Sequence, residues 1–101
     1  MNKFTLSQLA LDDLKSIARY TEGQWGQGQR NIYLKQFDDT FHMLADTPSL
    51  GMACDLILQG YKKCPQESHT VFYRILADDA LEITRVLHKS MDVNLGLTTS
   101  S

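Results

Sequence analysis

The sequence predicts one α+β domain in which a short strand, a helical hairpin and three further strands follow one another. Two segments in the first half carry apolar residues at helical spacing. In the second half, residues 69–76 and 81–88 are rich in β-branched and aromatic residues and flank a tight turn. We therefore expect an antiparallel helical hairpin packed on a small antiparallel sheet. The 101 residues suit one domain, with residues 93–101 as a tail that docks and then frays.

The first elements are a strand and a helix. Residues 3–6 are typical of an edge strand with Phe4 and Leu6 on one face. Ser7 offers a hydroxyl to the free amides of a helix start. The apolar stripe of the helix consists of Ala10, Leu14, Ile17 and Ala18. We expect the helix to fade near Gly23 and Trp25 to plug the corner that follows.

A second helix fills the rest of the first half. Its stripe consists of Tyr33, Leu34, Phe37, Phe41, Leu44 and Ala45. Pro48 stops it, because the residue before a proline is pushed out of helical geometry. The two stripes cannot cover each other completely, so the hairpin needs a further apolar surface, which the later strands provide.

The C-terminal half supplies those strands. Residues 49–60 read as a loop, and a short strand over residues 61–64 ends at Pro65. Residues 69–76 and 81–88 form a hairpin, for which we take Asp78 and Asp79 as a two-residue turn. A slip of one residue would reverse the faces assigned to one of these strands.

That turn fixes a register in which each pair of facing residue numbers sums to 157. Arg74 then faces Ile83, Phe72 faces Arg85, and His69 faces His88 on the opposite side of the sheet. Arg74 and Arg85 become diagonal neighbours on one face. Leu81, Ile83 and Leu87 share this face, which mixes aliphatic residues with cations. Such a patch is more typical of protein binding than of RNA binding.

Composition and motifs exclude several classes of protein. The net charge of −2 disfavours a protein that coats nucleic acid by charge alone, and we expect no sequence-specific contact with nucleic acid. Cys54 and Cys64 are too few for a disulfide scaffold and match no zinc spacing, so we expect free thiols and neither metal nor cofactor. No apolar run is long enough to cross a membrane, and the N-terminus lacks a signal-peptide core. The expected compartment is the cytoplasm.

A set of residues spread over positions 4–92 carries a family resemblance. In order, it consists of Leu14, Ile17, Tyr20-Thr21, Trp25-Gly26, Pro48, Gly51, Cys54-Asp55, Gly60-Tyr61, Pro65, His69, Phe72-Tyr73-Arg74, Ile83, Arg85-Val86-Leu87-His88 and Met91-Asp92. In this order and spacing the chain resembles the ParE toxins of the RelE/ParE superfamily. The resemblance implies the toxin of a type II toxin–antitoxin module, held in a hetero-oligomer by a ParD-type antitoxin. When free, such a toxin poisons DNA gyrase by binding and has no catalytic residue.

Two alternatives stay open, because the fold is shared across the superfamily. RelE-like relatives cut messenger RNA in the ribosomal A site. Here Arg74 and Arg85 could hold a phosphate and His88 could act as the acid. The predicted register opposes this, since it places His88 on the other face. The second alternative is an inactive relative that only binds antitoxin.

The candidate antitoxin- or target-binding residues follow from the mixed face, the corner and the C-terminal segment. They are Trp25, Arg74, Leu81, Ile83, Arg85, Leu87, His88, Lys89, Met91 and Asp92. Each has a structural alternative as well. Arg85 suits an ion pair with a carboxylate, and His88 suits backbone groups at the end of the sheet.

Overall fold

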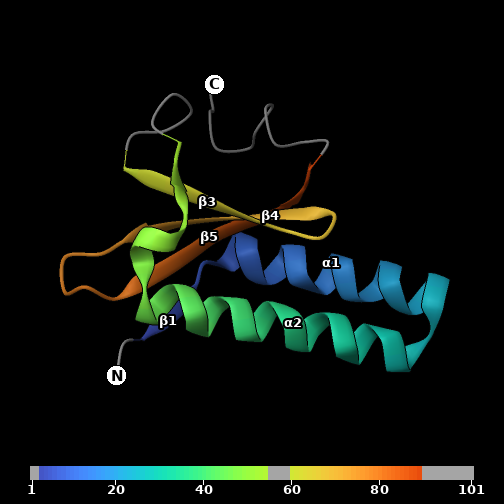
Figure 1. Ribbon diagram of the computed structural model, residues 1–101. Coiled ribbons are helices and arrows are strands. Elements are labelled where there is room, and N and C mark those ends of the chain that lie inside the picture. The colour runs from blue at the N-terminus through green and yellow to red at the C-terminus, as the bar shows by residue number, and fades with distance from the viewer. Residues whose placement is uncertain (1–2, 55–59, 90–101) are drawn as a thin grey trace.

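The computed structural model describes residues 3–54 and 60–89 (Figure 1). Its elements are β1 (Phe4–Leu6), α1 (Gln8–Trp25), α2 (Gln27–Asp46), the 3₁₀ turn η1 (Pro48–Leu50), β2 (Met52–Ala53), β3 (Tyr61–Gln66), β4 (His69–Ile75) and β5 (Leu81–His88). The predicted α+β fold, with a strand and two helices before the main strands, is confirmed. Within the described residues, no helix is long and apolar enough to span a bilayer.

The sheet has the strand order β1-β5-β4-β3-β2. β1 is an edge strand, as expected, but it pairs with β5 in parallel, so the sheet is mixed. β2 lies in the stretch that we expected to be a loop, and β3 continues through Pro65 to Gln66. A proline is tolerated there because β2 pairs only with Lys62 and Lys63, which leaves Pro65 on an edge in the described part of the sheet.

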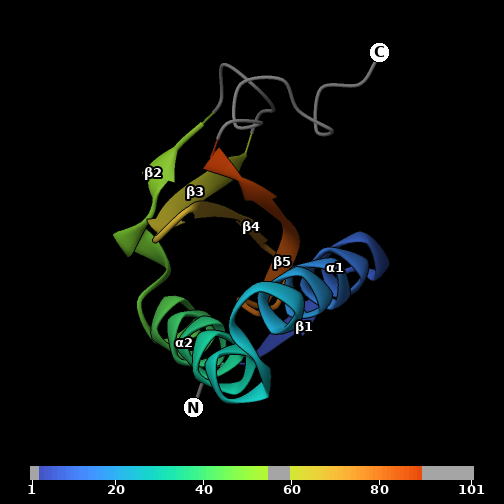
Figure 2. The same ribbon diagram turned by 90° about the vertical axis from the view of Figure 1, so that its right-hand side faces the viewer.

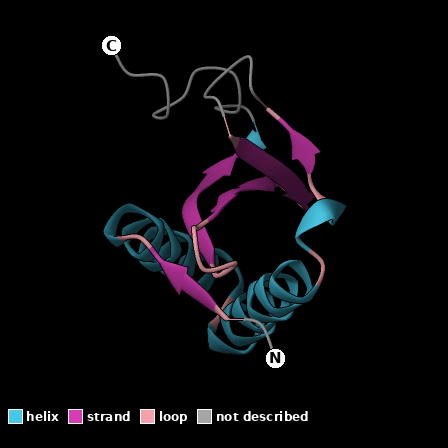
Figure 3. Ribbon diagram, turned by 90° about the vertical axis from the view of Figure 1, so that its left-hand side faces the viewer, coloured by secondary structure: helices cyan, strands magenta, loops and turns pink. Residues whose placement is uncertain are grey.

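Both helices cover one face of the sheet, which curves over them in Figures 2 and 3. Between these two layers lies the main core. Its fully or nearly fully buried members are Ala10, Ile17, Phe37, Phe41, Leu44, Val71, Tyr73, Leu81, Ile83 and Val86. The aromatic side chains of α2 therefore fill the space that the predicted stripe required.

A smaller cluster occupies the opposite face, where Phe72 and Leu87 pack with Cys54 and the half-buried Tyr61. This arrangement corrects the mixed face expected from the sequence. Leu81 and Ile83 are fully buried in the helix-side core, whereas Leu87 belongs to the cluster on the other face.

The β4–β5 hairpin explains that correction. Its turn has three residues between Leu76 and Ala80, and Asp79 adopts φ 66°. Next to this turn, the residue numbers of each facing pair therefore sum to 156 and not to the predicted 157. A bulge then leaves Thr84 without a facing residue and restores the predicted sum of 157 from Arg85 onward. Arg74 therefore faces Glu82 instead of Ile83, while Phe72 still faces Arg85 and His69 still faces His88.

The helical hairpin turns at Gly26, which has φ 93° and follows α1 directly. Ser7 caps α1 as expected, since its Oγ accepts a hydrogen bond of 3.0 Å from the Ala10 amide. Trp25 is the last residue of α1 and does not plug the corner, because the residue is 70% exposed. An ion pair of 2.7 Å between Arg30 and Glu22 bridges the two helices instead.

Candidate functional site

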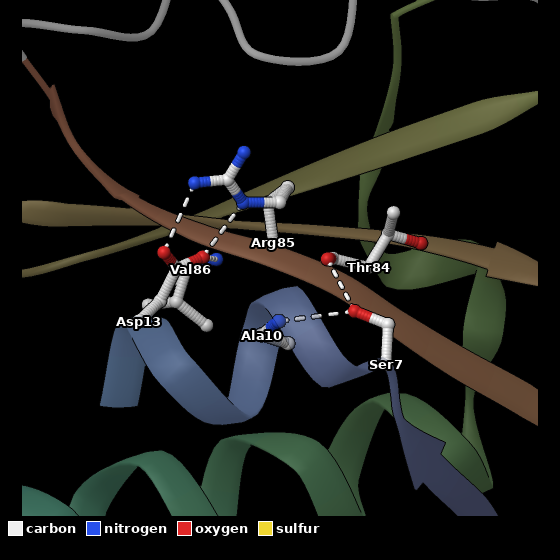
Figure 4. A network of polar contacts seen from close by, with 6 residues as sticks. All are labelled: Ser7, Ala10, Asp13, Thr84, Arg85 and Val86. Atoms are coloured by element: carbon white, nitrogen blue, oxygen red, sulfur yellow. Dashed lines mark hydrogen bonds and ion pairs between the residues drawn. The ribbon is translucent and has the colours of Figure 1, made fainter. Parts of the chain in front are cut away.

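Arg85 is fixed to helix α1 by Asp13 (Figure 4). Its Nε and Nη2 donate to the two carboxylate oxygens at 2.8 and 3.0 Å, which is the bidentate geometry favoured by arginine and carboxylate. The same carboxylate accepts a hydrogen bond of 3.0 Å from the Val86 amide. Both charged side chains are largely buried, with exposed fractions of 17% and 15%.

The pKa of Arg85 is raised chiefly by its hydrogen bonds to Asp13, and partial burial opposes this effect. The guanidinium group therefore stays charged and oriented toward α1. Of the two roles considered for Arg85, the structure shows the ion pair with a carboxylate.

Arg74 differs from Arg85 in its exposure. Its Nε donates to Glu82 at 2.8 Å, and its guanidinium carbon lies 5.8 Å from the ring centre of Tyr61. The Arg74 side chain remains 45% exposed, so a partner can reach it. The hydrogen bond to Glu82 is the main cause of the raised pKa of Arg74. Both arginines of the predicted site thus have a carboxylate partner within the chain.

His88 lies on the helix side of the sheet, as the register predicted, and belongs to a group of aromatic side chains. Its ring centre is 5.4 Å from that of His69 in an edge-to-face arrangement. Nδ1 of His69 is 2.8 Å from the hydroxyl oxygen of Tyr33 in α2. Burial lowers the pKa of His69, the neighbouring His88 lowers it further, and Asp13 opposes the shift. This group is separated from Arg74 and Arg85 by the sheet.

A groove of about 840 Å³ lies beside the helical hairpin, near the corner that joins α1 to α2. We call it the hairpin groove. Its lining residues are Ser16, Ile17, Tyr20, Thr21, Trp25, Gln29, Tyr33, Gln36, Glu67, Ser68, His69 and His88. In Figure 1 the α1–α2 corner extends past the end of the sheet near the β3–β4 turn, and the lining residues come from these parts. The volume lies within the range of about 300–1,000 Å³ typical of ligand sites.

Sequence analysis assigned only Trp25 and His88 of this groove as candidate site residues. It missed Tyr20, Tyr33 and Glu67, which are separated by up to 47 positions in the chain. The one available signal was Tyr20, an aromatic residue outside the apolar stripe of α1, and it is 68% exposed. An exposed aromatic side chain beside the exposed Trp25 marks this end of the hairpin as unusual.

The other predicted site residues are dispersed. Leu81, Ile83 and Leu87 are buried in the two clusters. Lys89 is exposed, and its backbone amide donates to the Ser68 carbonyl at 2.8 Å. Met91, Asp92 and the predicted tail lie outside the described residues. The predicted set thus occupies separate places in the fold, and only Trp25 and His88 meet in one cavity.

The described residues contain no group of three or more histidine, cysteine or acidic side chains that could hold a metal ion. Neither Cys54 nor Cys64, both in the described part of the chain, forms a disulfide bond. Cys54 belongs to the cluster on the outer face, whereas Cys64 packs against the main core. Burial raises the pKa of the Cys64 thiol.

Comparison with known proteins agrees with this fold. The family described as "ParE toxin of type II toxin-antitoxin system, parDE" matches residues 4–93. Toxin ParE1 of Mycobacterium tuberculosis CDC 1551 is 36% identical over 95% of this chain and 98% of its own length. Toxin ParE1 of Caulobacter vibrioides is 37% identical over 96% of this chain and 99% of its own length.

A solved structure also has the same fold. A chain from the chromosomal ParDE toxin–antitoxin system of P. aeruginosa superposes with a TM-score of 0.75 at 14% identity. The match covers 87% of this chain and 96% of the other. From the family match and the identity to two ParE1 proteins along nearly their whole length, the chain belongs to the ParE toxin family of type II toxin–antitoxin systems.

Proposed function

We propose that this chain is neutralised by a ParD-type antitoxin and that, when free, it binds and poisons DNA gyrase in the cytoplasm. In this proposal it makes and breaks no covalent bond. Its membership in the ParE family and its fold, shared with a chain of a ParDE system, support the antitoxin partner.

The separation of Arg74, Arg85 and His88 supports binding over RNA cleavage. Arg85 is occupied by Asp13 and Arg74 by Glu82. An RNase would need its phosphate-binding cations and its general acid around one phosphate. Here the sheet lies between the two arginines and His88. The RelE-like mechanism would therefore require a rearrangement of this site.

A supercoiling assay tests the proposal. Purified chain is added to purified gyrase, relaxed plasmid and ATP, with and without the antitoxin encoded by the adjacent gene. We expect loss of supercoiling, accumulation of cleaved plasmid after denaturation, and recovery when the antitoxin is added. Unaffected gyrase together with codon-register cuts in transcripts on translating ribosomes would show the RelE-like activity instead. If neither activity is present while the antitoxin still binds, the chain is an inactive relative.

Arg74 is a predicted site residue whose side chain is exposed, so we propose that it contacts gyrase. Arg74→Ala should weaken gyrase inhibition by about tenfold, the loss expected for an interface arginine. Arg19→Ala is the matched control, since Arg19 is also exposed and lies on α1 outside the hairpin groove. Equal inhibition by the wild type and Arg74→Ala would remove Arg74 from the contact surface.

A further inference from the structure

The strand β1 forms one edge of the sheet, and part of its backbone is directed away from the sheet. Two hydrogen bonds of 3.0 Å to β5 use the Lys3 carbonyl and the Ser7 amide. Successive residues of a strand present their backbone groups to opposite sides. The amides and carbonyls of Phe4 and Leu6 therefore point to the free edge, away from β5.

The other edges of the described sheet are blocked or short. β5 extends past β1, but there the side chains of Ser7 and Asp13 bind its backbone (Figure 4). On the far side β2 has two residues, and Pro65 lacks the amide that a strand pairing with β3 would need. β1 itself contains neither a proline nor a charged residue. An edge without these protecting features is a template for a strand from another chain.

The free edge of β1 is complementary to a second copy of itself. Two β1 strands that run antiparallel about Thr5 place Phe4 opposite Leu6 of the other copy. Both residues of this pair direct their amide and carbonyl toward the junction, so they exchange both hydrogen bonds of a ladder pair. Thr5 of one copy then faces Thr5 of the other at the two-fold axis, in a pair without hydrogen bonds.

The side chains of β1 suit the same pairing. Phe4 and Leu6 face the buried Leu81 and Ile83 of β5, and they pack, half-buried, against the main core. Facing residues of neighbouring strands have their side chains on the same face of a sheet. The pairing therefore joins the apolar side chains of both copies into one surface, while the exposed Thr5 lies on the other face.

An apolar groove of about 320 Å³ continues this surface between the two helices, and we call it the β1 groove. Besides Phe4 and Leu6, its apolar lining residues are Leu14, Ala18, Leu34, Phe37 and Phe41. Those of α1, together with Leu34 of α2, are only half-buried in the single chain. Covering this groove with a second copy removes apolar surface from water, which favours association.

Two charged residues at the β1 groove are complementary under the same two-fold symmetry. Lys15 of α1 and Asp38 of α2 both line the groove, and both are exposed. In a two-fold dimer, a contact between Lys15 of one copy and Asp38 of the other occurs twice. A second copy thus matches both charges, whereas a segment that carries charge of one sign leaves one of them unmatched.

We propose that β1 and the β1 groove form a two-fold interface between two copies of this chain, in which antiparallel β1 strands join the two sheets. The inference does not depend on the proposed antitoxin or on the proposed target. Because β1 is short, we expect a weak dimer in reversible exchange with the monomer.

Sedimentation velocity of the purified chain without antitoxin tests this interface over a wide range of concentrations. We expect the wild type to shift from monomer to dimer as its concentration rises. Thr5→Lys should weaken the dimer at least about tenfold, because it places like charges opposite each other at the two-fold axis. A wild type that stays monomeric, or a dimer that Thr5→Lys leaves equally stable, would overturn the inference.

The matched control for Thr5→Lys is Gln24→Lys. Gln24 is also exposed, and it lies near the end of α1 that is farther from β1. This variant adds the same charge outside the interface, so it should leave the dimer unchanged. Circular dichroism melting curves establish that every variant is folded.

A cysteine at the two-fold axis tests the register directly. Facing residues of a pair without hydrogen bonds have Cα atoms about 4.5 Å apart, which a disulfide can bridge. Under mild oxidation, Thr5→Cys should therefore form a covalent dimer faster than Gln24→Cys does. The wild type, which contains Cys54 and Cys64, gives the background rate. Equal rates in the two variants would overturn the proposed register.

An exchange of charges tests the contact between Lys15 and Asp38. Lys15→Glu and Asp38→Lys should each weaken the dimer, because each places like charges across the interface. The double variant restores opposite charges and should recover most of the affinity, and added salt should reduce these differences. A double variant no tighter than the single variants would overturn the two-fold arrangement.

Calorimetry with the antitoxin encoded by the adjacent gene separates a second copy from another occupant. Thr5→Lys should bind the antitoxin at least as tightly as the wild type does, because in this proposal the edge of β1 pairs with a second copy. Reduced antitoxin affinity of Thr5→Lys, together with a wild type that stays monomeric, would assign the edge to the antitoxin and overturn the inference.

Discussion

Asp13 supplies β5 with a hydrogen-bond acceptor at the point where β1 has ended. The pairing of β1 with β5 stops at Leu6 and Ile83. Beyond it, the carboxylate of Asp13 binds the Val86 amide and holds the guanidinium group of Arg85. Arg85, which we considered for target binding, thus also joins α1 to the sheet. Removing either charged partner leaves the other largely buried group without its ion pair, which is costly.

A double-mutant cycle separates the two roles of Arg85. We expect Asp13→Ala to lower the free energy of unfolding by about 1–3 kcal/mol, because it removes the hydrogen-bond acceptor of the Val86 amide and of the Arg85 guanidinium. Arg85→Ala should cost less, since the Asp13 carboxylate keeps its bond to Val86. The double variant should be more stable than the sum of the single effects predicts. Urea denaturation measures all three, and Asp12→Ala, an exposed neighbour, is the control.

Toxicity of the same variants decides the functional role of Arg85. If its role is structural, the loss of gyrase inhibition should follow the folded fraction equally in Asp13→Ala and Arg85→Ala. A folded Arg85→Ala protein without activity, beside an active Asp13→Ala protein, would instead show that Arg85 contacts the target.

At the scale of elements, the helical hairpin depends on the backbone of Gly26. Its amide donates to the Glu22 carbonyl at 2.9 Å, and its carbonyl accepts from the Arg30 amide at 3.1 Å. One residue therefore ends α1 and begins α2, and it does so at φ 93°. The corner places Trp25 among the lining residues of the hairpin groove, so the geometry of this turn also shapes that groove.

Gly26→Ala should destabilise the fold by about 1–2 kcal/mol, even though no atom lies within 4 Å of the added Cβ. The cost comes from the positive φ, which a side chain disfavours. Gly23→Ala is the matched control in the last turns of α1, where the space is equally open and φ is not positive. It should stabilise the helix by about 0.5–1 kcal/mol. Thermal unfolding followed by circular dichroism measures both, and equal stability of Gly26→Ala and the wild type would show that the corner can adopt another conformation.

At the scale of the whole molecule, the sequence predicted the order of the elements better than the faces of the strands. Apolar spacing identified both helices, and β-branched residues identified β4 and β5. The bulge at Thr84 changes which residues of β5 face the helices, from Leu81 and Ile83 before it to Val86 after it. A simple alternation of residues cannot locate such a bulge, so the predicted mixed face was wrong.

The candidate site was even harder to predict from the sequence than the faces of the strands. Trp25 and His88 were predicted as candidates, but their common groove also needs Tyr33 from α2 and Glu67 from the β3–β4 turn. These residues have no meaningful spacing in the chain, and only the packing of the hairpin against the sheet brings them together. Local pattern predicts elements, whereas a groove between elements depends on their tertiary arrangement.

That arrangement links the stability of the whole fold to pH through His69. Groups from three elements surround it: Asp13 of α1, Tyr33 and the buried Phe37 of α2, and His88 of β5. Burial lowers the pKa of His69 in the folded state, so the folded chain favours the neutral ring. The unfolded chain, with a histidine pKa near 6.5, takes up the proton more readily.

The free energy of unfolding should therefore be fully retained above about pH 6.5 and fall as the pH drops toward the lowered pKa of folded His69. Urea denaturation at pH 7.5, 6.5 and 5.5 measures this for the wild type and for His69→Gln. The loss of stability on acidification should be smaller in His69→Gln, because its side chain cannot be protonated. His42→Gln, on the exposed surface of α2, is the control for removing a histidine elsewhere. If the wild type and His69→Gln lose the same stability between pH 7.5 and 5.5, His69 does not link folding to pH.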